Sequence, residues 1–306
     1  MTSTKEDFFV EQLLLSIFTL RQHNEHLDIC VLTDSNTLTT FDSERNLSSA
    51  KVEPMVVDCP AGLTPKERSR FLEFAMRKTI CGDLLYIDSD TVVTDSLDGL
   101  DNLQGHIFAV RDKHTKTITP PVESVIKKSK LNFPEKYDYF NSGLIFSRDT
   151  PESSKFFDDW KNLWMEYKTG SFCLDQPGFN YSNIINGNII NELDGVWNCQ
   201  IFRNGAKFLP YAKVIHYYSV NDKNNPYILA RRWFFQKIRD NHYAIPTELS
   251  EMLVKPKSLI FPTSRIITRE NQIELLDSSI FECLSEKLIP HKLFFKTVNK
   301  ICSYFC

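Results

Sequence analysis

The sequence predicts an α/β fold in which a Rossmann-like, mostly parallel mixed sheet is flanked by helices. Strand-like apolar runs alternate with segments of helical periodicity along the chain, which is the pattern of an α/β sheet. Several of these runs end on acidic or polar residues, and open α/β sheets bind ligands at the ends of their strands. We therefore expect one domain over residues 1–250 and a C-terminal helical extension over residues 251–306.

The first expected element is a helix over residues 8–22, where apolar side chains recur at helical spacing. A buried strand over residues 27–34 follows and ends on an aspartate. The next helix begins at Thr64, a capping residue, continues with Pro65 at its first position and reaches Lys78.

The second half of the expected domain continues the alternation of strands and helices. The apolar run over residues 84–93 is typical of a buried central strand. Further strands are expected over residues 106–110 and 143–146, and a helix over residues 151–167. The lysine-rich and proline-containing residues 113–138 between them predict an irregular loop that faces the substrate.

An α/β nucleotide-binding fold normally begins with a strand, but this sequence leads directly into the helix over residues 8–22. We expect an additional strand of about five to eight residues upstream of Met1. Three explanations remain open: the start codon is assigned too late, the sequence was trimmed, or the sheet lacks this strand.

Composition limits the kind of protein. The 306 residues are 42% hydrophobic and 25% charged with a net charge of −3, as in an ordinary globular chain. Because no basic excess is present, we expect no nucleic-acid partner. Eight scattered cysteines without a C-x-x-C pair fit a reducing cytosol. The polar start and the lack of any run of about 18 apolar residues predict neither a signal peptide nor a transmembrane helix, and hence a cytoplasmic location.

Asp88 and Asp90 are the most informative pair, because an apolar run delivers both carboxylates to its end. Two buried anions side by side raise each other's pKa, and a hard cation such as Mg²⁺ or Mn²⁺ relieves that repulsion. The alternative is a turn in which both side chains only cap backbone groups.

Four further segments place polar side chains where strands or turns end, and each also has a structural interpretation. Asp112 is either a turn cap or a ligand contact. Asn141 and Ser142, the polar pair before the strand over residues 143–146, can also be explained by a β-turn. The acid and amide before Pro177 suit a helix N-cap as well as hydroxyl recognition. A histidine after a short apolar run is either structural or a third metal ligand. The residues concerned are Asp112, Asn141, Ser142, Asp175, Gln176 and His216.

The order of these motifs resembles that of the family 8 glycosyltransferases and related nucleotide-diphospho-sugar transferases, which have the GT-A fold. The resemblance covers about residues 1–235 and includes Ser16 to Arg21, similar to the family's Ser-Ile-x-Ser-Leu-Arg. Trp197 and Asn198 look like the Trp-Asn that precedes the family's last strand. The chain departs from the family after His216 and Tyr217, where the expected glycine is absent and the Lys-Pro-Trp segment is broken.

The resemblance implies a role for each matched residue. Asp88, Asp90 and His216 would hold Mn²⁺ (or Mg²⁺) with the donor's diphosphate, and Arg70 would contact the donor. Asp112, Asn141 and Ser142 would hold hydroxyls of the donor sugar, and Asp175 and Gln176 would lie beside its anomeric carbon. The remaining donor-binding candidates are Thr2, Ser3 and Thr4 in the uridine pocket, Ser89 between the two acids, and Lys223 in place of the family's diphosphate-binding lysine.

The function implied is transfer of a hexose from a UDP-sugar to a hydroxyl of a glycan or lipid-linked glycan, with retention of anomeric configuration, in polysaccharide or lipopolysaccharide biosynthesis. A sugar-nucleotide-binding protein with weak or lost transfer activity is the alternative. A nucleotidyltransferase is disfavoured because no Gly-rich basic phosphate loop is visible.

The C-terminal residues 284–306 are basic and rich in aromatic side chains. One interpretation is a helix that packs on the domain. The other is an interfacial helix that holds the protein loosely on an anionic membrane, on its inner face, through Lys287, Lys292, Lys296 and Lys300.

Overall fold

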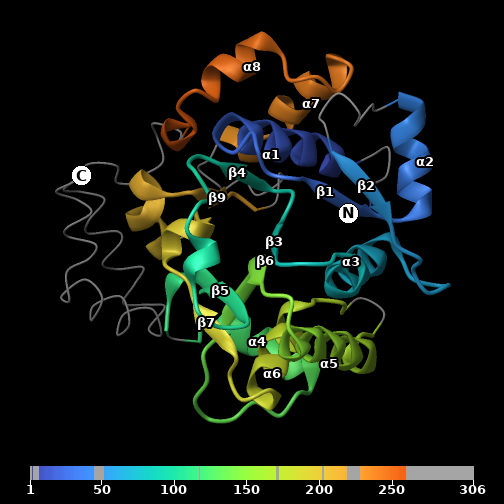
Figure 1. The fold of residues 1–306 in the computed structure, drawn as a ribbon, viewed down its shortest axis with the longest axis vertical. Helices are drawn as coiled ribbons and strands as arrows, with labels where there is room; N and C mark the ends of the chain where they lie inside the picture. Colours follow the sequence, from blue (N-terminus) through green and yellow to red (C-terminus); the bar gives the residue numbers. More distant parts are fainter. Residues whose placement is uncertain are drawn as a thin grey trace.

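Figure 1 shows the fold in the computed structural model, which describes residues 2, 7–44, 52–116, 118–169, 172–201, 203–218 and 228–259. The α-helices are α1 (Phe9–His23), α2 (Ser35–Glu44), α3 (Pro65–Thr79), α4 (Pro120–Ser129), α5 (Pro151–Tyr167), α6 (Gln176–Ile185), α7 (Arg232–Asp240) and α8 (Thr247–Met252). The strands are β1 (Cys30–Thr33), β2 (Glu53–Val56), β3 (Leu84–Ile87), β4 (Thr91–Val93), β5 (Ile107–Arg111), β6 (Phe140–Ser147), β7 (Ile190–Glu192), β8 (Cys199–Gln200) and β9 (Val214–His216). Short 3-10 helices are η2 (Leu100–Asn102), η3 (Asp112–His114), η4 (Gly195–Asn198), η5 (Arg203–Tyr211), η6 (Ile228–Ala230) and η7 (Pro256–Ser258).

Within the described residues the strands form sheets of order β1-β2, β3-β6-β5-β7 and β4-β9-β8. The pairs β1/β2, β5/β7 and β8/β9 are parallel, and the pairs β3/β6, β5/β6 and β4/β9 are antiparallel. The predicted α/β architecture with a mixed sheet is confirmed. Among the described strands the two kinds of pairing are equally frequent.

Helices cover both sides of this arrangement, as Figure 1 shows. The helices α3, α5 and α6 pack on one face of the sheet β3-β6-β5-β7, around the fully buried Trp160 and Trp164. The helices α1, α7 and α8 enclose a second apolar cluster against β4, β8 and β9. The helices expected over residues 8–22, 64–78 and 151–167 are confirmed as α1, α3 and α5.

The central strand β6 is buried along its whole length and runs antiparallel to both β3 and β5. Its register pairs Phe140 with Arg111 and Leu144 with Ile87. The first residues of β6 therefore lie beside the last residues of β3 and β5. The start of β6 and the ends of β3 and β5 thus meet at one edge of the sheet. This edge carries the candidate site.

The run over residues 84–93 is two strands rather than the single strand expected. The chain leaves β3 after Ile87 and enters β4 at Thr91, and these strands belong to different sheets. The peptide N–H of Asp88 still donates to Gly143 O of β6 (2.9 Å), whereas Asp90 O accepts from the N–H of Tyr217 beyond β9 (3.1 Å). The Asp-x-Asp segment is therefore the crossing between two sheets.

The irregular loop expected over residues 113–138 contains a helix, α4. Its Val122 and Ile126 pack against Tyr139 in a small apolar cluster, which explains why lysine-rich sequence folds there. At the C-terminal side, α8 crosses residue 250, the expected domain boundary. Residues 284–306, with both interpretations of them, lie outside the described residues. Among the residues described, no helix combines the length and apolar character needed to cross a membrane.

The capping residues predicted for α3 form a complete capping box. Glu67 N–H donates to Thr64 Oγ1 (3.3 Å), and Thr64 N–H donates to Glu67 Oε2 (2.9 Å). Lys168, at the end of α5, donates to the other carboxylate oxygen of Glu67 at 2.8 Å. This carboxylate therefore joins the start of α3 to the segment that leads to Asp175.

Replacing Glu67 by Gln is expected to lower the free energy of unfolding near neutral pH more than in acid. The hydrogen bonds from Lys168 and then Thr64 lower the pKa of Glu67 from 4.5 to about 2. A carboxyl group with a lowered pKa stabilises the fold above its ordinary pKa, and this contribution disappears as the pH falls toward the folded-state value. Urea denaturation of both proteins at pH about 7 and about 3 measures the difference.

The matched control is Glu123→Gln. Glu123 pairs with Lys127 at 2.7 Å on the exposed surface of α4, and exposed ion pairs contribute little to stability. An equal loss in both variants, or a loss for Glu67→Gln that does not change with pH, would contradict the assignment.

Candidate active site

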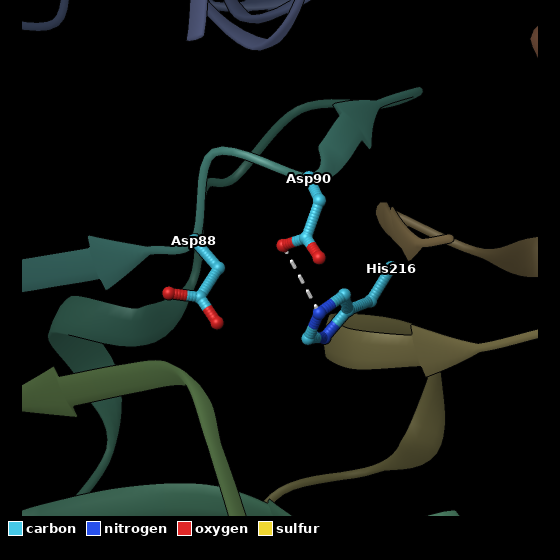
Figure 2. A group of neighbouring side chains, drawn as sticks. All are labelled: Asp88, Asp90 and His216. Carbon is cyan, nitrogen blue, oxygen red and sulfur yellow. Dashed lines mark ion pairs between the residues drawn. The ribbon is translucent and has the colours of Figure 1, made fainter. Parts of the chain in front are cut away.

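The structure brings Asp88, Asp90 and His216 together (Figure 2). Each offers one ligand atom, and the three atoms lie within 4.8 Å of one another. The antiparallel register of β4 and β9 pairs Thr91 with His216, so Asp90 faces the end of β9. His216 Nε2 lies 3.2 Å from Asp90 Oδ1, and the imidazole is only 3% exposed. His216 therefore lies beside the carboxylates and not among apolar side chains alone, and its role as a metal ligand stays a prediction.

A chain of hydrogen bonds fixes which imidazole nitrogen faces the carboxylates. The peptide N–H of Gly143 is only a donor, and it identifies the atom it contacts at 3.0 Å as Asn141 Oδ1. The same oxygen accepts from Asn198 Nδ2 (2.9 Å), which leaves Asn198 Oδ1 facing His216 Nδ1 at 3.2 Å. His216 therefore donates through Nδ1, and Nε2 is the atom that a cation would bind.

The three groups carry perturbed pKa values. Burial and the neighbouring Asp90 raise the pKa of Asp88 to about 6. Burial acts to raise the pKa of Asp90, but His216 outweighs it and the net shift is downward. Burial acts to lower the pKa of His216, but Asp90 outweighs it and the net shift is upward. A proton on Asp88 or on His216 Nε2 would therefore compete with a cation for the same atom.

The donor set fits a divalent cation. Two carboxylates and a neutral imidazole suit Mn²⁺, and carboxylate oxygens suit Mg²⁺. Tyr86, two residues before Asp88 on the same face of β3, donates its hydroxyl to Asp88 Oδ1 at 2.5 Å. The interpretation of Asp88 as a simple backbone cap is therefore not needed to explain its side chain.

The start of β6 connects the next expected residues. Asn141 Nδ2 donates to Asp112 Oδ1 at 3.2 Å and to Gln176 Oε1 at 3.3 Å. Asp112 and Asn141 are buried, and burial raises the pKa of the Asp112 carboxyl. An acid and two amides therefore converge at the same sheet edge as the Asp88 group.

Asp175 does not cap α6 with its side chain. One carboxylate oxygen accepts from Ser142 Oγ at 2.6 Å, and the other lies 3.0 Å from Arg70 Nε. Arg70 also donates through Nη1 to Glu73 Oε1 at 2.6 Å. Burial and then Asp175 raise the pKa of Glu73 well above its usual value, although Arg70 opposes this.

Aromatic side chains of α5 hold the backbone around Asp175 by hydrogen bonds to its carbonyl groups. Trp160 Nε1 donates to Asp175 O at 3.0 Å, and the Tyr167 hydroxyl contacts the same oxygen at 3.2 Å. Tyr167 also donates to Leu174 O at 2.6 Å. Because both rings are packed in the core, the position of Asp175 is set by rigid helical elements.

A cavity of about 560 Å³ lies next to the two acids, between α1, β1, α3 and β3. Thr2, Ser89 and Arg70, expected to bind the donor, line it. Its inner wall is apolar and includes Leu72, Met76 and Leu84. Ser3, Thr4 and Lys223 lie outside the described residues.

The same cavity separates the sheet β1-β2 from the sheet β3-β6-β5-β7. The strand expected upstream of Met1 stays a prediction.

Sequence patterns missed three residues of this site, Tyr86, Glu73 and Gln200. Tyr86 could have been found, because it lies two positions before Asp88 on one strand face. Glu73 could also have been found, since it lies three positions after Arg70 on one helix face. Asn198 was noted only through the family resemblance. Gln200, described below, carries no local signal.

Known proteins resemble this chain in sequence and in fold. The family model described as Glycosyl transferase family 8 matches residues 3–223. The apo structure of the bifunctional glycosyltransferase WbbM matches with a TM-score of 0.51 and 18% identity, covering 81% of this chain and 50% of that one. The galactosyltransferase LgtC in complex with donor and acceptor sugar analogues matches with a TM-score of 0.51 and 16% identity, covering 80% of this chain and 96% of that one.

This chain thus spans half the length of WbbM. At these identities the structural likeness shows the fold alone. No curated protein sequence matches the chain.

Replacing Gly143 by Ala is expected to weaken cation binding more than it weakens the fold. A Cβ at this position would lie 2.4 Å from His216 Cε1 and 2.8 Å from Asp88 Oδ2, so both side chains would have to move. We expect the Mn²⁺ dissociation constant, measured by titration calorimetry, to rise by roughly tenfold or more.

The matched control is Ile145→Val, two residues further along the same strand. It removes one buried methyl group from the core at a cost of about 0.5–1.5 kcal/mol of stability. Unchanged Mn²⁺ affinity in Gly143→Ala, or an equal loss in Ile145→Val, would show that Gly143 has no special role.

Cation binding is expected to weaken in acid. A cation displaces protons from Asp88, with its pKa of about 6, and from His216, whose pKa is raised by Asp90. Below about pH 6 each group that must lose a proton lowers the apparent affinity, by up to about tenfold per pH unit. Mn²⁺ titrations between pH 5 and 8 or so test this, and an affinity constant over that range would contradict it.

Proposed function

We propose, from the premise that this chain belongs to glycosyl transferase family 8 and is a glycosyltransferase, that it transfers a hexose from a UDP-sugar to a hydroxyl of a glycan acceptor. The observation that carries the proposal is the Asp88, Asp90 and His216 group beside the cavity of about 560 Å³. We assign these three residues to a bound Mn²⁺ or Mg²⁺. The acceptor class proposed includes lipid-linked glycans.

The charges of the site support a phosphate-bearing ligand held through a cation. Among the described residues, the hydrogen bonds and ion pairs of this region join five carboxyl groups, one guanidinium and one imidazole: Asp88, Asp90, Asp112, Asp175, Glu73, Arg70 and His216. A diphosphate alone would be repelled here. A divalent cation, when bound, supplies the charge that neutralises the leaving diphosphate.

The chain's own residues would bind and orient the sugar. We assign Asp112 and Asn141 to sugar hydroxyls, because a buried carboxylate and a primary amide accept and donate at one place. Ser142 and Arg70 hold the Asp175 carboxylate from two sides. We therefore place Asp175 and Gln176 beside the anomeric carbon of the donor sugar. Their fixed orientation would contribute to catalysis by holding the reacting groups close together.

The other donor-binding assignments are proposals of the same kind. Thr2 and Ser89 line the cavity, and we assign them to the nucleoside and diphosphate. We keep Ser3, Thr4 and Lys223 as candidates on the sequence resemblance alone. Retention of anomeric configuration is proposed from the family, and the configuration of the isolated product, read by NMR, decides it.

The alternative from the sequence, a sugar-nucleotide-binding protein without transfer activity, predicts a different result in one assay. Such a protein would bind UDP in the presence of Mn²⁺ but would release no UDP from a UDP-sugar. The connected groups around Asp175 favour the enzyme, because a pure binder has no need of an oriented acid at the reacting carbon.

Asp90→Ala is expected to abolish transfer while leaving the fold intact. Asp90 is 25% exposed, so its removal leaves no large cavity, but it takes away one of three cation-binding groups. UDP release from a panel of UDP-hexoses with Mn²⁺ should fall by about a hundredfold or more. The control is Asp101→Asn, an exposed acid in η2. Wild-type turnover by Asp90→Ala would disprove the assignment of the site.

A further inference from the structure

Gln200, at the end of β8, is fully buried, and its side-chain amide is used at both ends. Its Nε2 donates to Arg111 O at 2.8 Å. Its Oε1 accepts from the peptide N–H of Lys113 at 2.6 Å and from the Tyr218 hydroxyl at 2.8 Å. One amide therefore contacts two separate parts of the candidate site.

The first part is the strained turn that begins at Asp112. Lys113 and His114 have φ values of +55° and +51°, in the left-handed region that residues with a side chain rarely adopt. Burial lowers the pKa of His114 to about 3, so its ring is neutral and its Nε2 can accept from the peptide N–H of Gln200 at 3.0 Å. Gln200 thus holds this turn through its backbone and its side chain.

The second part is the imidazole of His216. The Tyr218 ring stacks on it with centroids 4.2 Å apart and planes 22° from parallel. Gln200 and His216 are also neighbours in the β8/β9 register. The Tyr218 hydroxyl is fixed by Gln200, so the amide limits the position of the ring that covers His216.

We propose that Gln200 is a positioning residue that couples the sugar-binding and cation-binding halves of the site. It holds the Asp112 turn on one side and, through Tyr218, the His216 ring on the other. Ordering either half by a ligand then orders Gln200 and favours binding at the other half. This inference rests on the proposed function for the identity of the two ligands.

The test compares Gln200→Leu with Tyr218→Phe. Gln200→Leu removes every side-chain hydrogen bond of the amide at similar volume. We expect it to raise the Mn²⁺ dissociation constant roughly tenfold, and to raise KM for the UDP-sugar at saturating Mn²⁺ by a similar factor. Tyr218→Phe removes only the hydroxyl contact, so we expect a few-fold weaker Mn²⁺ binding with little change in KM.

The double variant separates coupling from general damage. The Tyr218 hydroxyl acts through Gln200. The double variant should therefore have the same Mn²⁺ dissociation constant as Gln200→Leu alone. The matched control is Asn183→Leu in α6. Asn183 is another buried amide, and its Oδ1 accepts a hydrogen bond of 2.9 Å from the Ile190 N–H, outside the candidate site. It should lower the urea midpoint without changing either Mn²⁺ binding or KM.

The outcomes decide the proposal separately from the proposed function. Wild-type Mn²⁺ affinity in Gln200→Leu, or equal losses in Asn183→Leu, would overturn the role of Gln200. If Gln200→Leu does not fold, Tyr218→Phe decides instead, and unchanged Mn²⁺ affinity in it would overturn the link to His216. An unmodified protein that binds Mn²⁺ but releases no UDP would disprove the transfer reaction, while the Mn²⁺ titrations would still decide the role of Gln200.

Discussion

The close approach of His216 and Asp88 to the backbone of β6 at Gly143 is the constraint on which the candidate site depends. The Gly143 N–H fixes the orientation of the Asn141 amide, and its carbonyl accepts from the N–H of Asp88. The absence of a Cβ leaves room for both ligand side chains. Gly143 therefore sets the imidazole orientation through its N–H and pairs with Asp88 of the neighbouring chain segment through its carbonyl. Any change in strand register would alter the cation-binding geometry at once.

The topology explains why residues so far apart in sequence meet. β6 runs antiparallel to β3 and β5, so its beginning lies beside their ends. β9 runs antiparallel to β4, so its end lies beside the beginning of β4. The Asp88–Asp90 segment crosses from one sheet to the other at this point. The cation group thus spans two sheets, and each of its members is attached to a strand end rather than to a mobile loop.

Local patterns in the sequence predict the parts of this structure that local physics determines. Apolar spacing gives α1 and α5, and Thr64 with Pro65 gives the start of α3, because helices depend on neighbours three or four residues away. Long-range contacts are different. Asn198 and Asn141 are 57 residues apart, and Gln200 and Arg111 are 89 apart, so no spacing rule connects them. The break in the run over residues 84–93 was missed for the same reason. Both halves are apolar, and only their partner strands distinguish them.

The carboxyl groups of the site explain why its organisation and its ligand are linked. The pKa values of Asp88, Asp112 and Glu73 all lie above their usual range, chiefly because burial disfavours their charged forms. Arg70 contacts two carboxylates of the group and cannot neutralise all of them. Placing these charged groups side by side in a buried site carries a free-energy cost that a divalent cation would reduce. The fold thus concentrates negative charge where the proposed cation binds. Hydrogen bonds from Tyr86, Asn141 and Ser142 keep three of these carboxyl groups oriented without a cation.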